Sequence, residues 1–418
     1  MKKQQGINVL SLFDGMGCGW IALKELGIKV NNAYASEIDK FAIAQTTYNF
    51  PDVVHLGSVT DVDVSKLEPI DLLIGGSPCM QLSFAGRRTG LSTIDKEEIK
   101  TLDRYLELKS GGFQFDGQSY LFGEYMRILN DIRKYNPNVL FLLENVEMGK
   151  KWETVFNEAI GIRGVHINAA LVSAQNRRRI YWTNICVGHD ALLGQFSDIP
   201  LPEDKNVMLK DVLEDEVEEK YYLSDNTAER LMNQKKAGTY SPYKFNIIEQ
   251  PGEQKGLLVK EYQIVKPMPN KLGYVKTQKM PCLTSSYRYG VVTNYGTRPA
   301  IMEIEKNTRL SDKETLFSLA VPNKDTQSND ISFMEPRCRI RRLTPMEFAR
   351  LQTIPEWYEW KSKFPNGKIK DTSASQIYKM CGNGWCVEVI KHIFSFMRHD
   401  QNDKENTEQN SNQNKIEQ

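Results

Sequence analysis

The sequence lacks the cysteine spacing that disulfide frameworks and structural zinc sites require. It contains seven cysteines, an odd number, and no two of them form a Cys-x-x-Cys motif. Small secreted scaffolds have even, closely spaced sets, and zinc sites have pairs two to four residues apart. We therefore expect a reducing compartment and no bound metal.

Long apolar runs are missing as well. The longest, Val139–Leu143, is far shorter than the roughly 20 apolar residues that cross a bilayer. The first apolar stretch is interrupted by Asn8, Ser11 and Asp14, so it does not have the pattern of a secretory signal. These absences predict a cytoplasmic protein that does not contact a membrane.

Net charge is almost absent, since 54 Lys and Arg stand against 53 Asp and Glu. The charge is unevenly spread, however: residues 231–301 hold eleven Lys or Arg and only three acids, with seven tyrosines between them. Concentrated positive charge in an otherwise acidic chain fits a phosphate backbone as partner. A solvated basic surface is the alternative that the pattern leaves open.

Short apolar runs alternate with helical patterns over the first 190 residues. Strands are expected at Asn8–Phe13, Ala33–Ser36, Asp71–Ile74 and Val139–Leu143, with helices between them. This alternation predicts an α/β fold with a Rossmann-like, mostly parallel sheet and helices on both faces. Such sheets bind ligands beyond the carboxyl ends of their strands.

Changes in composition and apolar periodicity divide the chain into four expected segments. Residues 1–220 form the expected catalytic and cofactor-binding domain, and residues 221–339 a smaller β-rich domain rich in Pro, Gly, Tyr and Asn. Apolar periodicity returns in residues 340–398, which should rejoin the first domain. Residues 399–418 are almost wholly polar, and we expect them to be disordered.

A glycine-rich segment, residues 12–19, follows the first expected strand and opens a helix. Its glycines allow close approach of backbone to a ligand. Glu37 ends the next expected strand, where a carboxylate can accept hydrogen bonds from ribose hydroxyls. An ordinary tight turn with an unrelated glutamate downstream is the competing interpretation.

Three further motifs carry reactive side chains at expected strand ends. Cys79 follows Gly-Gly-Ser-Pro after the strand Asp71–Ile74, where it is either a nucleophile or a small buried residue. Glu144 follows five apolar residues and is either an acid with a raised pKa or a surface carboxylate. In Gln175–Arg179, alternation places Arg177 and Arg179 on one face, able to clamp a base or a phosphate.

The order of these motifs resembles the DNA (cytosine-5) methyltransferase family over about residues 9–396. Residues 13–19 resemble its cofactor loop, Pro78-Cys79 its nucleophile motif, Glu144-Asn145-Val146 its acid motif and Gln175-x-Arg177-x-Arg179 its arginine motif. Residues 341–347 and 382–385 resemble its two closing motifs. The cofactor loop, Ser-Pro-Cys and Trp385 resemble the de novo branch and related phage enzymes in particular.

The resemblance implies an enzyme that transfers a methyl group from S-adenosylmethionine to carbon 5 of a flipped cytosine through a covalent Cys79 adduct. It assigns catalysis to Cys79, Glu144, Arg177 and Arg179. It assigns cofactor binding to Phe13, Asp14, Gly15, Gly17, Glu37, Ser58, Pro78, Asn383 and Trp385. It assigns substrate contacts to Ser83, Asn145 and Gln175, and it makes residues 221–339 a target-recognition domain.

Two positions depart from the family pattern, and one long segment stands out. Met80 follows the nucleophile where many members have Gln or Asn, and Ser58 stands where the family usually has an Asp for the adenine. The departure at Ser58 puts adenine recognition in question.

The polar stretch Leu82–Gln118 is suited to a lid over the flipped base, with a disordered insertion as the alternative.

Double-stranded DNA is the expected partner of a monomeric enzyme of bacterial or phage type, which could accompany a restriction endonuclease acting on the same site. The alternatives are a tRNA cytosine-5 methyltransferase and a catalytically silent regulatory relative. A nicotinamide oxidoreductase would explain the glycine loop and Glu37, but it leaves Cys79, Glu144 and the basic region unexplained.

Overall fold

The computed structural model of the chain describes residues 6–78, 92–112 without 96, 115, 118, 120–226 without 225, and 338–397, together with short strands between 260 and 305. Cys79, Met80 and Ser83 lie outside these residues. So do most of the expected target-recognition domain and the polar tail 399–418.

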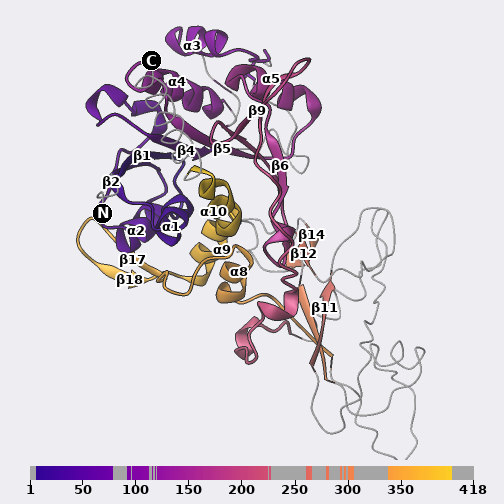
Figure 1. Ribbon diagram of the computed structural model, residues 1–418. Helices are drawn as coiled ribbons and strands as arrows, with labels where there is room; N and C mark the ends of the chain where they lie inside the picture. The colour runs from indigo at the N-terminus through magenta and orange to yellow at the C-terminus, as the bar shows by residue number, and fades with distance from the viewer. Residues whose placement is uncertain are drawn as a thin grey trace, which may run out of the picture.

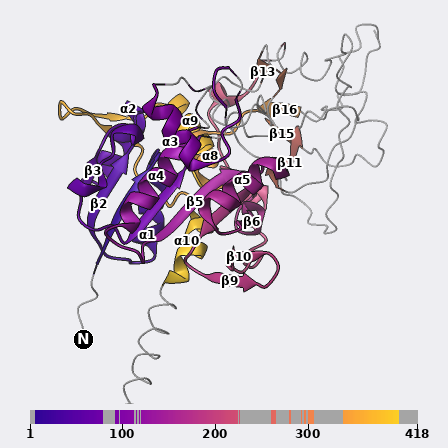
Figure 2. The same ribbon diagram turned by 90° about the horizontal axis from the view of Figure 1, so that it is seen from above.

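A seven-stranded sheet forms the centre of the molecule, with its strands in the order β3-β2-β1-β4-β5-β8-β6 (Figures 1 and 2). The first five pair in parallel, whereas β8 is antiparallel to both of its neighbours. The strands are β1 Ile7–Leu12, β2 Val30–Ser36, β3 Val53–His55, β4 Leu72–Gly76, β5 Leu140–Val146, β6 Val165–Asn168 and β8 Arg178–Thr183. The predicted Rossmann-like, mostly parallel sheet is confirmed.

Helices cover both faces of this sheet (Figure 1). One face carries α3 Leu102–Ser110, α4 Leu121–Arg133 and α5 Lys150–Ile160. The other carries α1 Cys18–Glu25, α2 Lys40–Asn49, α8 Pro345–Leu351, α9 Ala374–Asn383 and α10 Val387–Ser395. Successive strand residues point to opposite faces of the sheet. Val9 packs in the core that includes α10, and Leu10 packs in the core that includes α4. The C-terminal helices therefore complete the core that the N-terminal strands begin.

Smaller elements surround the main sheet. Short strand pairs are β9 Val187–Asp190 with β10 Gly194–Ser197, β17 Lys361–Lys363 with β18 Ile369–Asp371, β7 Gln175–Asn176 with β12 Met280–Pro281, and β13 Val292–Thr293 with β14 Gly296–Thr297. A three-stranded antiparallel sheet has the order β11 Lys260–Val265, β15 Ala300–Glu305, β16 Cys338–Arg341. Short 3₁₀ helices lie at Val59–Asp61, Val64–Lys66, Ala169–Leu171, Leu209–Asp211 and Glu219–Tyr221.

A buried ion pair joins this three-stranded sheet to the C-terminal helices. Arg341 ends β16, and its Nη1 and Nη2 each lie 2.8 Å from a carboxylate oxygen of Glu347 on α8. Both side chains are fully buried. Thr344 caps α8, and its N–H donates to the same carboxylate at 2.8 Å, which completes a capping box. The sequence motif at 341–347 thus encodes both a helix start and a bidentate charge pair.

The stretch that was expected to be a lid or a disordered insertion contains a packed helix among its described residues. Helix α3 begins after Thr101, whose side chain accepts from the N–H of Arg104, and it buries Tyr105 and Leu108 against α4. Gly123 of α4 lies so close to the Tyr105 ring that a Cβ there would be 2.5 Å from it. Residues 102–110 therefore form part of the core on the α4 side of the sheet.

Candidate active site

Glu144 lies near the carboxyl end of β5, where the adjacent strand β4 also ends. Its neighbour in β4 is Gly76, and Cys79 follows three residues later, outside the described residues. The Glu144 side chain is only 11% exposed. Arg179 Nε lies 2.8 Å from Oε1, and the indole Nε1 of Trp385 donates to Oε2 at 3.1 Å. Both carboxylate oxygens are thus held by donors from distant parts of the chain.

The contact between Trp385 and Glu144 requires a glycine at position 76. A Cβ at Gly76 would lie 2.8 Å from Trp385 Nε1 and 3.0 Å from Glu144 Oε2. Any larger residue would push the indole away from the carboxylate. The second glycine of the Gly-Gly-Ser-Pro-Cys motif therefore makes room for the contact between Trp385 and Glu144.

Asn145 fixes the backbone that leads to the expected nucleophile. Its amide Nδ2 donates to the carbonyl of Ser77 at 3.2 Å and to the Ser77 hydroxyl at 3.0 Å. Both residues are buried. Asn145 thus holds Ser77 beside β5, with partly exposed Pro78 next in the chain. Ser83, the other expected substrate contact in this loop, lies outside the described residues.

Arg177 and Gln175 do not point at Glu144, in contrast to Arg179. Arg177 Nη2 donates to the carbonyls of Gly384 at 2.8 Å and Gly382 at 3.4 Å. Gln175 is buried, and its Nε2 donates to the carbonyl of Leu351 at 3.3 Å. Arg177 lies between β7 and β8, and burial alternates along residues 175–179, with Arg177 and Arg179 both less exposed than Arg178 between them. Arg177 reaches the turn at 382–384 while Arg179 reaches Glu144, so a joint clamp on one group stays a prediction.

The glycine-rich segment forms a tight turn between β1 and α1. Phe13, Gly15 and Gly17 all have positive φ, at 56°, 60° and 82°. The N–H of Gly15 donates to Glu37 Oε2 at 2.9 Å, and the other oxygen of Glu37 accepts from the N–H groups of the next two residues. The two expected parts of the cofactor site therefore meet through a direct hydrogen bond.

Ile38 is a candidate site residue that the sequence motifs do not single out. It follows Glu37 directly at the end of β2, and it is 71% exposed although it is large and apolar. This exposed side chain gives the expected cofactor site an apolar surface beside Glu37. Ser58, which was the expected adenine contact, has its hydroxyl 2.7 Å from that of Thr60, and Asp61 is exposed beside it.

Asp14 is a buried carboxyl group in the floor of this turn. Burial, opposed by hydrogen bonding to Ser11 and reinforced by the charge of Glu37, raises its pKa to about 7. Its Oδ1 has no hydrogen-bond partner among the described residues, while Thr46 lies 3.4 Å from Oδ2. A buried acceptor without a donor fits a ligand that brings a polar N–H group, as an amino-acid ammonium does.

Replacing Asp14 by Asn should stabilise the cofactor-free protein more at pH 8 than at pH 5. Because the pKa is raised from 3.8 to about 7, the folded state holds this proton more tightly than the unfolded state does. The contribution of Asp14 to stability therefore falls as pH rises from about 4 to about 7. The gain from D14N in urea unfolding should be larger by about 2–3 kcal/mol at pH 8. An equal gain at both pH values would contradict this assignment.

The remaining expected cofactor contacts lie at the end of α9. Asn383 is the last residue of that helix and is exposed, and Gly384 leads to the partly buried Trp385. Cys18 lies beside this turn, where burial raises the pKa of its thiol to about 12. That thiol is thus a packing group rather than a candidate nucleophile.

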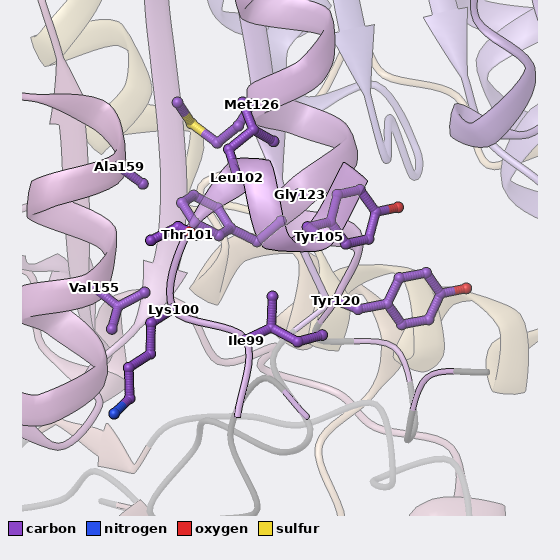
Figure 3. Close-up of a pocket in the computed structure, with 11 residues that line it drawn as sticks. Ile99, Lys100, Thr101, Leu102, Tyr105, Tyr120, Gly123, Met126, Val155 and Ala159 are labelled. Carbon is purple, nitrogen blue, oxygen red and sulfur yellow. The ribbon is translucent and has the colours of Figure 1, made fainter. Parts of the chain in front are cut away.

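A separate cavity of about 20 Å³ lies between α3, α4 and α5 (Figure 3). Its walls are largely apolar, with Leu102, Met126 and Val155 among them, and they include no carboxylate, cysteine or histidine. The space is close to that of a single water molecule. We assign no chemistry to it.

The described residues contain neither a metal-binding cluster nor a membrane-spanning helix. Within these ranges no group of three or more His, Cys, Asp or Glu is arranged to hold a metal ion. In the same part of the chain, every helix is too short or too polar to cross a bilayer.

Comparison with known proteins places the chain in a family. The model of the C-5 cytosine-specific DNA methylases matches residues 7–104 and 109–399. Orphan methyltransferase M.SPRI of Bacillus phage SPR is 25% identical over 475 aligned residues, which cover 96% of this chain and 99% of that protein. Type II methyltransferase M1.ScrFI of Lactococcus lactis subsp. cremoris is 30% identical over 239 residues, covering 54% of this chain and 53% of its own.

Solved structures share the fold over nearly the whole chain. The methyltransferase EhMeth of Entamoeba histolytica has a TM-score of 0.55 at 14% identity, covering 95% of this chain and 99% of its own. The Dnmt2 methyltransferase of S. pombe has a TM-score of 0.54 at 16% identity, with the same coverage. The protein therefore belongs to the C-5 cytosine-specific DNA methylase family of S-adenosylmethionine-dependent methyltransferases.

Proposed function

We propose that this protein transfers a methyl group from S-adenosylmethionine to carbon 5 of a cytosine that has been flipped out of double-stranded DNA. The observation that carries the proposal is the buried carboxylate of Glu144, which Arg179 and Trp385 hold at the end of the strand next to the one leading to Cys79. A fixed carboxylate and a thiol on adjacent strand ends suit attack on a ring held between them.

Cys79 is the proposed nucleophile. Its thiolate would form a bond to ring carbon 6, and the electron pair displaced from the 5,6 double bond would make carbon 5 nucleophilic. Glu144 in its protonated form would donate its proton to ring nitrogen 3 and accept from the exocyclic amine, which neutralises the charge that develops on the ring. Arg179 would keep Glu144 in this orientation. After carbon 5 gains the methyl group, loss of its proton to a base and expulsion of the Cys79 thiolate would restore the 5,6 double bond. Because a duplex encloses both ring carbons in its base stack, the base must leave the stack before Cys79 can reach it.

The residues around the glycine turn fit S-adenosylmethionine. Glu37 would accept from its ribose hydroxyls, Ile38 would pack on its adenine, and the unpartnered Oδ1 of Asp14 would accept from its ammonium group. The turn itself, with positive φ at Phe13, Gly15 and Gly17, lets backbone approach the ligand closely. When bound, the cofactor supplies an electrophilic methyl group. Ser58, Pro78 and Asn383 remain proposed contacts.

We propose residues 221–339 as the target-recognition domain, flanked by the catalytic segments 1–220 and 340–398. The high density of Lys, Arg and Tyr in residues 231–301 supports this assignment, because basic side chains neutralise backbone phosphates and aromatic ones stack on bases. The buried pair Arg341–Glu347 joins its last described strand to the catalytic helices.

Methyl transfer from labelled S-adenosylmethionine tests the proposal. The wild-type protein should label DNA, and Cys79→Ala should abolish the label while DNA binding persists. Cys186→Ala is the matched control, since that cysteine is only partly buried and belongs to none of the proposed contacts. Labelling of tRNA but not of DNA would replace the proposed substrate with the alternative one. Labelling by Cys79→Ala at the wild-type rate would refute the mechanism.

A further inference from the structure

We infer that Trp385 is a positioning residue for Glu144, and that Arg177 acts on the same carboxylate indirectly by holding the turn that carries Trp385. This inference rests on the proposed function, because it concerns the geometry of the proposed acid. It gives both residues roles different from those expected of a cofactor contact and a base clamp.

The first observation is that each oxygen of Glu144 has its own hydrogen-bond donor. Arg179 on β8 lies against Oε1, and the indole N–H of Trp385 donates to Oε2. A carboxylate held at one oxygen can still rotate about its terminal torsion, which has a broad energy profile. A second donor on the other oxygen removes that freedom. Trp385 therefore determines the plane that Glu144 presents to a base.

The second observation is the space that the indole occupies. Glycines line it on two sides: a Cβ at Gly76 would lie 2.8 Å from the indole nitrogen, and one at Gly19 would lie 3.6 Å from the indole ring. Gly19 belongs to the start of α1, next to the cofactor turn, and Gly76 ends β4. The indole thus packs between the cofactor turn and the strand that leads to Cys79, and this packing fixes the direction of its N–H.

The third observation is how the turn before Trp385 is held. Arg177 is 4% exposed, and its guanidinium donates to the carbonyls of Gly382 and Gly384. Gly384 is itself packed so closely that a Cβ would lie 3.0 Å from the carbonyl of Met380 and 3.1 Å from the sulfur of Cys18. A buried guanidinium whose Nη2 donates to these carbonyls restrains the backbone from which the indole projects. Arg177 therefore acts at one remove from Glu144.

Trp385→Phe is the variant that separates positioning from packing. Phenylalanine keeps an aromatic ring between the two glycines but has no N–H for Glu144. We expect kcat for methyl transfer to DNA to fall about 10–100-fold, the range for loss of a hydrogen bond to a charged group. KM for S-adenosylmethionine and for DNA should stay within about twofold, because the ring and the cofactor turn remain.

Trp357→Phe is the matched control. The indole of Trp357 also donates to a carboxylate, Oε1 of Glu25 at 2.5 Å, but that pair lies at the far end of α1 and is exposed. This substitution should leave kcat unchanged. Equal losses in the two variants, or a Trp385→Phe effect confined to KM for S-adenosylmethionine, would overturn the inference.

A double-mutant cycle then shows whether Trp385 acts through Glu144. In an E144Q background, W385F should lower the residual rate by less than about twofold, since the carboxylate that it orients is gone. Arg177→Lys tests the same contact through the turn that carries Trp385. It should lower kcat, and adding W385F to this variant should lower kcat little further. Fully additive effects in both cycles would refute the inference. An inactive wild-type protein would instead refute the proposed function.

Discussion

Replacement of Glu144 by Gln is expected to lower methyl transfer to DNA by about 10²–10⁴-fold, the range associated with losing a general acid or a fixed electrostatic group. The amide has nearly the shape of the carboxylate, but it carries two N–H donors on one side. Because Arg179 and Trp385 donate to the two oxygens of Glu144, one of them would then face another donor. The variant loses both the charge and one of its two fixed contacts.

Single-turnover rates with labelled cofactor measure this loss, and equilibrium binding separates it from weaker association. Binding of S-adenosylmethionine should change little, because Glu144 is not among its proposed contacts. Glu153→Gln is the matched control, since Glu153 lies on α5 and faces His166 at 3.0 Å. Wild-type rates in E144Q would show that the reaction does not use this carboxylate.

Replacement of Arg341 by Met is expected to cost about 3–5 kcal/mol of unfolding free energy, because it leaves the buried charge of Glu347 without its partner. Both oxygens of Glu347 face the guanidinium at 2.8 Å, and neither side chain is exposed. The N–H groups of Thr344 and Glu214 still donate to Glu347, but they carry no full charge.

Urea unfolding measures this effect, and a second substitution identifies its cause. The double variant R341M/E347Q should be more stable than R341M alone, because the glutamine is neutral and its oxygen can still accept from the N–H of Thr344. Lys361→Met is the control: its pair with Glu359, also 2.8 Å apart, is exposed, so the unfolding midpoint should not move. A loss in R341M no larger than in K361M would show that the buried pair does not stabilise the domain.

The sequence predicts well where the strands that border the site end. Five apolar residues before Glu144 indicate a buried strand, and parallel strands place their carboxyl ends together. Glu144 and Gly76 are indeed neighbours, and Glu37 lies against the glycine turn. Local pattern suffices here because the sheet fixes where each strand stops.

Contacts between distant segments could not be predicted in the same way. Trp385 and Glu144 are 241 residues apart, and the indole reaches the carboxylate only because α9 and α10 pack back on the first core. Arg177 was expected to share a face with Arg179 on the assumption of one continuous extended strand. Burial does alternate along residues 175–179, but Arg177 reaches the turn at 382–384 and Arg179 reaches Glu144, and neither partner can be inferred from the local pattern.

The segment after the proposed nucleophile shows a different limit of prediction from sequence. Residues 82–118 have the composition of a polar loop, yet Leu102–Ser110 form α3, because Tyr105 and Leu108 fall on one helical face and Gly123 of α4 makes room for the Tyr105 ring. That complementarity belongs to the pair of helices. The sequence of either segment alone does not reveal this complementarity.

Covalent trapping tests the central claim most directly. DNA in which fluorine replaces hydrogen at carbon 5 of cytosine cannot release that substituent as a cation, so a Cys79 adduct that has accepted the methyl group should persist. With S-adenosylmethionine present, we predict a protein–DNA complex that survives denaturation, is absent in Cys79→Ala and forms far more slowly in Glu144→Gln. Methylation of ordinary DNA without any trapped complex, or trapping that is unchanged in Cys79→Ala, would contradict a reaction centred on these two residues.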